Sequence, residues 1–287
     1  MISYNPKDWF TFIFRFHKSD TLRKLFPLII GIAIYTFIVA YLETEVFKLS
    51  QNSHLKNIMT MHTMLAFVIS LLLVFRTNTA YDRWWEGRKL WGSLVNNSRN
   101  LALKLSSILT ENEDKLFFRK IIPHYADVLN LHLKNQKINL ELFDEYKIDI
   151  NNKIHKPNQV VKILFQKINE LHIQRKISGE QLIYLNLELI SFTDICGACE
   201  RIKNTPIPYS YSVFLKKFIF FYVMSLPLGF VFSLGYYTIP VVVFIFYVLA
   251  SLELIAEEIE DPFGDDENDL PTTKISVTIK KNIEEIL

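Results

Sequence analysis

The sequence predicts an all-helical membrane protein with four transmembrane helices and a large cytoplasmic helical region. Half of its 287 residues are hydrophobic, and long uncharged runs alternate with charged stretches. Apolar residues in the charged stretches recur at intervals of three and four, and no alternating β pattern competes with them. A net charge of only +2 argues against nucleic acid as a partner.

Three uncharged runs provide the membrane spans. Residues Leu25–Leu42 make 18 uncharged residues, about 27 Å of helix, and Met59–Phe75 carries only a histidine. Phe218–Leu252 has 35 uncharged residues, too long for one crossing, and Gly235 is the natural place for a reversal. We therefore predict four spans, and their approximate bounds are 25–42, 58–75, 214–233 and 236–255. Because the first apolar run begins only at Leu25, we expect a retained helix rather than a cleaved signal peptide.

Basic residues near the span ends set the orientation. Lys and Arg are dense before the first span, after the second and before the third, but sparse between the first two. The excess marks the cytoplasmic side, so both termini and the middle region are expected inside. The predicted divisions are an N-terminal segment, two spans, a cytoplasmic helical region, two spans, and an acidic loop with a tail: 1–24, 25–75, 76–213, 214–255 and 256–287.

The middle region contains no uncharged stretch long enough to cross a membrane. Its periodicity predicts four helices, Leu90–Leu109, Asp114–Leu133, Asn158–Lys176 and Ser178–Lys203. The polar, Asn-rich segment Asn135–His155 is expected to connect them. Beyond Leu270 the mixture of polar and apolar residues predicts no particular element.

The second span carries Phe67, Leu71 and Phe75 four residues apart, on one helical face. This face is either ordinary packing or the lining of a pore, and the residues alone leave both open. A pore with a hydrophobic constriction would require a ring of subunits, because one chain of four spans cannot enclose it. His62 in the same span is either a functional group or a neutral interfacial histidine.

A cysteine pair, one glutamate and a group of acids are further candidates for chemistry. Cys196 and Cys199 form a CxxC pair inside a predicted helix with no preceding strand, which favours packing over a thiol oxidoreductase. Glu180 opens a predicted helix as an acid of the first turn. Acids crowd the end of the fourth span and oppose the helix dipole, which invites a compensating cation. The acids beyond it suit a Ca²⁺ loop or a solvated turn, namely Asp261, Asp265, Asp266, Glu267 and Asp269.

At three ordered motifs the sequence resembles the bestrophins, in the branch found in bacteria. The first runs from Phe75-Arg76 through Asn78, Ala80, Tyr81 and Arg83-Trp84-Trp85-Glu86 to Arg88. The second comprises Cys196, Glu200-Arg201-Ile202 and Thr205-Pro206-Ile207-Pro208. The third is Ile259-Glu260-Asp261-Pro262-Phe263-Gly264 with Asp266, Asn268, Asp269, Leu270 and Pro271. The resemblance covers nearly the whole chain.

This resemblance implies a homopentameric ion channel of the bacterial inner membrane, surrounded by lipid and passing small monovalent ions passively. Phe67, Leu71 and Phe75 match the three apolar positions of the family's pore neck. A second, cytoplasmic constriction would fall near Glu180, where the family often has an apolar residue. An acidic ring favours cations, so we expect cation permeation, with an anion channel of the same architecture as the alternative.

The resemblance also raises Ca²⁺ as a possible ligand, with no other cofactor expected. Asp266 and Asp269 match the two side-chain ligands of the Ca²⁺ clasp in animal bestrophins. Asn268 interrupts the acidic run here, and Leu270-Pro271 replaces the usual ending, so the match is incomplete. Outside the channel class, the alternatives are a membrane thiol oxidoreductase using Cys196 and Cys199 and a non-conducting scaffold.

Overall fold

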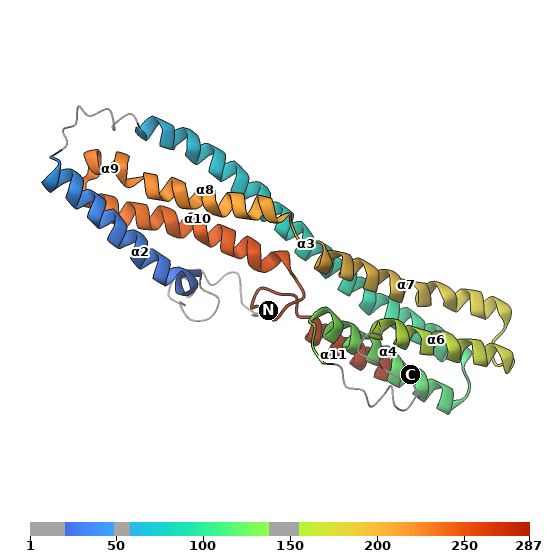
Figure 1. Ribbon diagram of the computed structural model, residues 1–287. Helices are drawn as coiled ribbons and strands as arrows, with labels where there is room; N and C mark the ends of the chain where they lie inside the picture. Colours follow the sequence, from blue (N-terminus) through green and yellow to red (C-terminus); the bar gives the residue numbers. More distant parts are fainter. Residues whose placement is uncertain (1–20, 49–57, 138–154) are drawn as a thin grey trace. The chain divides into compact units, whose positions relative to one another are not determined.

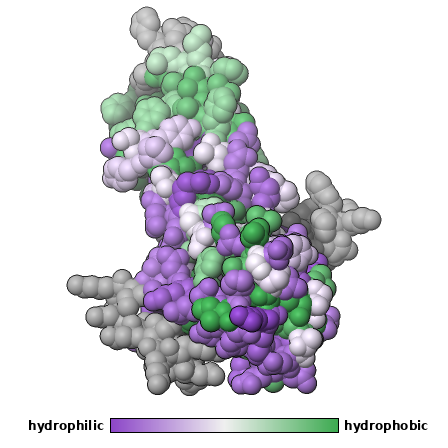
Figure 2. All heavy atoms as spheres, turned by 90° about the vertical axis from the view of Figure 1, so that its right-hand side faces the viewer, coloured by the Kyte–Doolittle hydropathy of each residue, from purple (hydrophilic) through white to green (hydrophobic). Residues whose placement is uncertain are grey.

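The computed structural model describes residues 21–48, 58–137 and 155–287, and every regular element in these ranges is helical. The chain forms two compact units. The apolar unit comprises the described part of 2–83 together with 206–260. The polar unit comprises the described part of 84–205 together with 261–287. Figure 2 shows that hydrophobic surface gathers in one part of the molecule and that hydrophilic residues dominate the rest.

The described part of the apolar unit is built from helices (Figure 1). It contains α2 (Thr21–Tyr41), a π-helical turn (Leu42–Val46), the first half of α3 (Ile58–Ile108), α8 (Tyr209–Ser225), α9 (Pro227–Leu234) and α10 (Thr238–Glu260). Gly235 separates α9 from α10 with a φ of +53°, a left-handed conformation that glycine adopts without steric cost. The reversal predicted at this glycine is confirmed.

The polar unit is a helical bundle around one hydrophobic core. It contains the second half of α3, α4 (Asn112–Leu133), α6 (Lys156–Ile173), α7 (Gly179–Asn204) and α11 (Thr272–Ile286). The largest fully buried side chains of its core come from three of these helices and from the segment before α11: Trp91, Phe118, Tyr125, Phe192 and Phe263. The hydroxyl of Tyr125 donates to the carbonyl of Phe192 at 2.6 Å, so the polar atom of this buried side chain is hydrogen-bonded within the core.

Among the described residues, four helical stretches are long and apolar enough to cross a membrane: Thr21–Val46, Ile58–Ile108, Gly179–Asn204 and Tyr209–Glu260. The last contains the third and fourth predicted spans, divided at Gly235. Helix α7 meets the same criterion of length and composition, although the sequence placed it in the cytoplasmic region. Its apolar character has another explanation, because Leu185, Leu189 and Phe192 lie in the core of the polar unit.

The helix bounds differ from the prediction at four places. The second span and the helix predicted at Leu90–Leu109 form one unbroken helix of 51 residues, α3. Pro227, which has no amide hydrogen to donate, opens α9 just after α8 ends at Ser225. Helix α10 extends to Glu260, through the crowded acids. Helix α11 was not predicted at all. Most of the predicted connector Asn135–His155 lies outside the described residues, as does most of the segment 1–24.

Candidate functional site

The first half of α3 has two unlike faces. Ile69, Leu73 and Arg76 are buried within the apolar unit, whereas Phe67, Leu71 and Phe75 are 72%, 46% and 57% exposed. Residues four apart return to the same side of a helix, so the exposed three form a stripe. Large apolar side chains exposed on a single chain must meet lipid, another chain or a pore. The packing explanation within one chain therefore does not apply to this face.

Arg76, next to Phe75, points the other way into a buried ionic cluster. Its side chain is 1% exposed, and its Nη2 donates to Glu260 Oε2 at 2.7 Å. Its Nε lies 3.4 Å from Glu253 Oε2. Glu260 also accepts the backbone N–H of Ile207 at 2.6 Å and, through its carbonyl, the Nε–H of Arg83 at 3.0 Å. This cluster fixes α3 to α10 and to the start of α8.

The crowded acids at the end of α10 receive the compensating cations that the sequence called for. Besides Arg76, Lys24 of α2 binds Glu258 at 2.6 Å, and Lys216 of α8 binds Glu257 at 2.9 Å. Basic residues of three other helices thus balance acids that oppose the dipole of α10. The sequence predicted that a cation would compensate these acids, but it did not identify the basic side chains that do so.

His62 is a packed side chain in the apolar unit. It is buried, and its Nε2 lies 3.0 Å from the hydroxyl oxygen of Ser225. Its ring stacks on Phe230 and meets the edge of Tyr222. These contacts hold α3 against α8 and α9, so His62 has a packing role distinct from the exposed stripe.

Glu180 lies in the first turn of α7, where Ser178 and Gln181 form a capping box. The hydroxyl of Ser178 donates to Glu180 Oε2 at 2.6 Å. The expected N-terminal position is confirmed, since a carboxylate favours the positive end of a helix. Ile183 and Leu187 follow at helical spacing and are 73% and 69% exposed, so Glu180 begins an otherwise apolar exposed stripe.

The segment that follows α10 packs closely on the second half of α3. Trp84 donates its indole N–H to the carbonyl of Asn268 at 3.0 Å. A Cβ on Gly87 would lie 3.1–3.2 Å from side-chain atoms of Phe263, Leu270 and Pro262. The sequence motifs include Trp84, Phe263 and Leu270 but not Gly87, and the structure gives a reason for this glycine, because a side chain there would crowd the segment.

Asp269 is the buried acid of this segment. One of its oxygens accepts the backbone N–H of Asp266 at 2.5 Å, and among the described residues Oδ1 has no hydrogen-bond partner. Burial raises the pKa of Asp269 from 3.8 to about 7. Asp265, by contrast, binds Lys134 and Gln136.

An unpartnered carboxylate oxygen beside a second carboxylate fits a hard cation such as Ca²⁺. Asp266 and Asp269 would supply the side-chain ligands, and carbonyl groups of the same segment the rest. The Lys134 ammonium on the neighbouring Asp265 weakens the attraction for a cation. Calcium binding stays a prediction on these two residues.

Cys196 and Cys199 are both free thiols buried in the core of the polar unit. A redox-active thiol must be accessible and must ionise readily, which a buried apolar position opposes. The packing role that the sequence favoured for these cysteines agrees with this environment.

Comparison with known proteins identifies the family of this chain over nearly its whole length. The family model described as bacterial/fungal bestrophin protein matches residues 1–285. The chain belongs to the bestrophin family. The resemblance recognised at the three motifs is thereby confirmed, and the four apolar helical stretches make this bestrophin an integral membrane protein.

Two relatives and two solved structures show how close the similarity is. The voltage-dependent anion channel-forming protein alr2987 of Nostoc sp. is 35% identical over 98% of this chain and 92% of its own. The voltage-dependent anion channel-forming protein YneE of Escherichia coli K12 is 30% identical over the same shares.

The structure of a bacterial bestrophin homologue from Klebsiella pneumoniae has a TM-score of 0.81 at 25% identity, covering 92% of this chain and 98% of its own. A structure described as a membrane protein gives a TM-score of 0.83, also at 25% identity, over 92% and 97%. The all-helical architecture is thus a bestrophin architecture. The predicted preference for cations has no support here, because the relatives are named for anions.

Proposed function

We propose that the chain forms a homopentameric ion channel of the bacterial inner membrane, with Phe67, Leu71 and Phe75 lining its neck. The observation that carries this proposal is the division of α3 into a packed face and an exposed aromatic face in a bestrophin chain. In a ring of five chains each exposed residue becomes a ring of five side chains. The stripe then forms three stacked apolar rings over about 12 Å of helix.

The neck would act as a gate because apolar rings hold water poorly. When a narrow constriction is lined by Phe and Leu, water leaves it and ions meet a barrier. Widening or wetting the neck lowers that barrier. The buried Arg76 cluster supports this role by fixing α3 to α10, so that the exposed face keeps its orientation.

Small monovalent anions are the permeant ions we propose, on the strength of the relatives' names. The positive edges of Phe rings offer anions a favourable surface without a fixed charge. Glu180 would oppose this preference if it lined the second constriction, since an acidic ring favours cations. The apolar exposed positions Ile183 and Leu187 that follow it support a lining role for this face of α7.

The proposed topology places both termini on the cytoplasmic side. The spans would be α2, the first half of α3, α8 with α9, and α10. Helix α7 would lie outside the membrane, because its buried side chains belong to the core of the polar unit. The excess of Lys and Arg beside the spans supports this orientation.

A reversal potential in asymmetric NaCl, recorded from the purified channel in a planar bilayer, tests the function. We expect current in the wild type, a reversal potential towards the chloride equilibrium, and a larger current in Phe75→Ala. The control is Phe221→Ala, which removes an exposed ring from α8 and should leave the current unchanged. Absence of current in both the wild type and Phe75→Ala would refute the channel. Equal gains in the two variants would refute the neck assignment.

The same recording on Glu180→Gln tests the second constriction. If the carboxylate faces the pore, its removal shifts the reversal potential further towards chloride. An unchanged ratio of anion to cation permeability would show that Glu180 does not line the pore. The capping box of Ser178 and Gln181 remains intact in this variant, so α7 should still form.

A further inference from the structure

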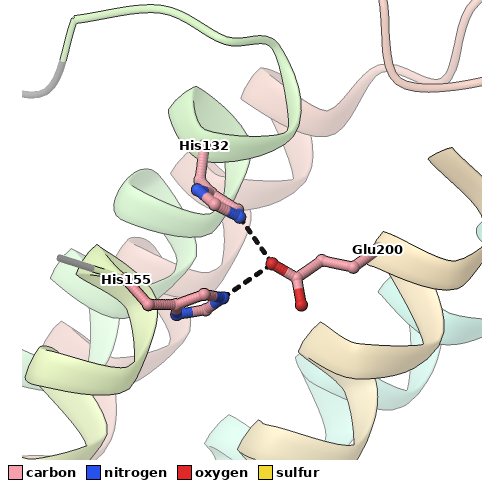
Figure 3. A group of neighbouring side chains, drawn as sticks. All are labelled: His132, His155 and Glu200. Atoms are coloured by element: carbon pink, nitrogen blue, oxygen red, sulfur yellow. Dashed lines mark hydrogen bonds and ion pairs between the residues drawn. The ribbon is translucent and has the colours of Figure 1, made fainter. Parts of the chain in front are cut away.

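Three polar side chains from three helices of the polar unit converge on one point (Figure 3). His132 lies in the last turn of α4, His155 is the N-cap of α6, and Glu200 lies near the end of α7. The Nε2 atom of each histidine is 2.6 Å from the same carboxylate oxygen, Glu200 Oε1. The three atoms all lie within 4.8 Å of one another, and each residue is half-buried.

Simple ion pairing does not require this geometry. A carboxylate has two oxygens, and two imidazoles seeking hydrogen bonds can take one each. Here both rings point to the same oxygen, and this brings the three donor atoms within 4.8 Å of one another, close enough to reach one ion after a small movement. Two imidazole nitrogens and a carboxylate oxygen form the donor set that suits Zn²⁺ and its neighbours among the first-row divalent metals.

We propose that His132, His155 and Glu200 bind one divalent cation of the zinc class, with water as the fourth ligand. The site is independent of the proposed channel and would exist whether or not the chain conducts ions. It is separate from the candidate Ca²⁺ residues, which offer oxygen ligands only.

Metal binding requires two small changes at the site. Tetrahedral zinc with ligands at 2.0–2.1 Å holds its donor atoms about 3.3 Å apart, so the side chains must spread from their present 2.6 Å. Half-buried side chains can rotate by this amount. The backbone N–H of Asn158 donates to His155 Nδ1 at 3.2 Å, which places the proton of the neutral ring on Nε2. When Nε2 takes the metal, the neutral ring carries its proton on Nδ1, so the long capping bond from Asn158 is lost.

The two basic side chains next to the site, Lys203 and Arg201, are hydrogen-bonded to groups other than the three ligand atoms. The ammonium of Lys203 is held by the carbonyl of His132 and by Asn135 Oδ1. Arg201, next to Glu200, turns to Glu86 and binds it at 2.8 Å. A metal would join the end of α4, the start of α6 and the end of α7. We therefore expect it to stabilise the polar unit.

Zinc titration of the full-length protein in detergent, after removal of metal with a chelator, tests this site. We expect one Zn²⁺ per chain and a higher melting temperature with zinc. His132→Ala, His155→Ala and Glu200→Gln should each weaken zinc binding at least tenfold. His172→Ala, a histidine outside the cluster, should bind zinc like the wild type. A wild type that binds no zinc, or zinc binding unchanged in all three variants, would overturn the proposal.

A second measurement uses the wild type alone and so avoids any variant that fails to fold. Diethylpyrocarbonate modifies accessible imidazole nitrogens, and mass spectrometry locates the modified histidines. Zinc should protect His132 and His155 but leave His172 equally modified. Equal modification of His132 and His155 with and without zinc would also overturn the site.

Discussion

Phe75 and Arg76 are neighbours in sequence with opposite surroundings. The ring of Phe75 is 57% exposed, whereas the guanidinium of Arg76 is buried between Glu253 and Glu260. Consecutive helical residues point about 100° apart, so one turn of α3 can serve a surface and a core together. The consequences of substitution at these two residues should therefore differ in kind.

Arg76→Gln should destabilise the protein by about 3–5 kcal/mol, because it leaves Glu253 and Glu260 without their buried partner. The measurement is the unfolding of purified protein in detergent. Lys216→Gln is the matched control: its pair with Glu257 is half-exposed and should contribute about 0–1 kcal/mol. Adding Glu260→Gln to Arg76→Gln should recover part of the loss. If Arg76→Gln and Lys216→Gln had equal effects, the buried cluster would not hold α3.

Asp114 gives the polar unit a predictable response to acid. Burial would raise the pKa of this carboxyl, but hydrogen bonds from Lys167 and Lys176 outweigh burial and hold it below its ordinary 3.8. A depressed pKa in the folded state contributes stability above the unfolded pKa. That stability is lost as the pH falls below about 4 and through the folded value.

Asp114→Asn should cost about 1–3 kcal/mol at neutral pH, as expected when a charged hydrogen-bond acceptor is removed. Melting temperatures of wild type and variant, compared from neutral pH to pH below 4, provide the check. The two should converge in acid, because the wild-type carboxyl is then protonated. A difference that stays constant down to the lowest pH would contradict the ion-pair account.

At the scale of elements, α3 packs against the segment that follows α10 through a glycine. Gly87→Ala should destabilise the protein by about 1–3 kcal/mol, because the added methyl group meets Phe263, Leu270 and Pro262. Gly197→Ala on α7 is the matched control, since nothing lies within 4 Å of its Cβ. There alanine should stabilise the helix by up to about 1 kcal/mol. Opposite signs in thermal melting would confirm this close approach, and equal signs would contradict it.

The sequence predicted elements well where hydrophobic residues followed a single rule. Uncharged runs located α2, α8 and α10, and apolar spacing located α4, α6 and α7 to within a few residues. Helix α11 was missed, although Ile275, Ile279 and Ile283 recur every four residues, with two lysines between the last two. This apolar pattern is short and follows an acidic loop. Only the structure shows that Ile279 and Ile283 are buried in the core of the polar unit.

Sites formed by residues that lie far apart in the sequence could not be predicted from it. His132, His155 and Glu200 belong to separate helices, and no local pattern links them. The inward direction of Arg76 was equally hidden, because its acidic partners lie at the far end of α10. The exposed stripe of α3 was found because its three residues share one helix. Local spacing thus predicted a face, whereas only the fold could bring the ionic and metal-type clusters together.

At the scale of the whole molecule, a pore follows only if several chains present the same face to one axis. A substitution at Leu71 would then appear once per chain around the neck. Leu71→Ser adds a hydroxyl to an apolar ring, so each variant chain should ease wetting and raise the conductance by a further step. Channels assembled from wild-type and Leu71→Ser chains should therefore show intermediate conductances between those of the two pure channels.

Co-expression of the two chains with different tags, tandem purification and single-channel recording would reveal these steps. Val248→Ser provides the control, since Val248 is exposed on α10 and not on the face of α3 that carries the stripe, and mixing it should give one conductance. If α3 met lipid through Phe67, Leu71 and Phe75, Leu71→Ser would leave conductance unchanged at every mixing ratio. If each chain conducted alone, only the two pure conductances would appear. Graded conductance requires several copies of Leu71 around one path, which is the arrangement that the exposed face of α3 predicts.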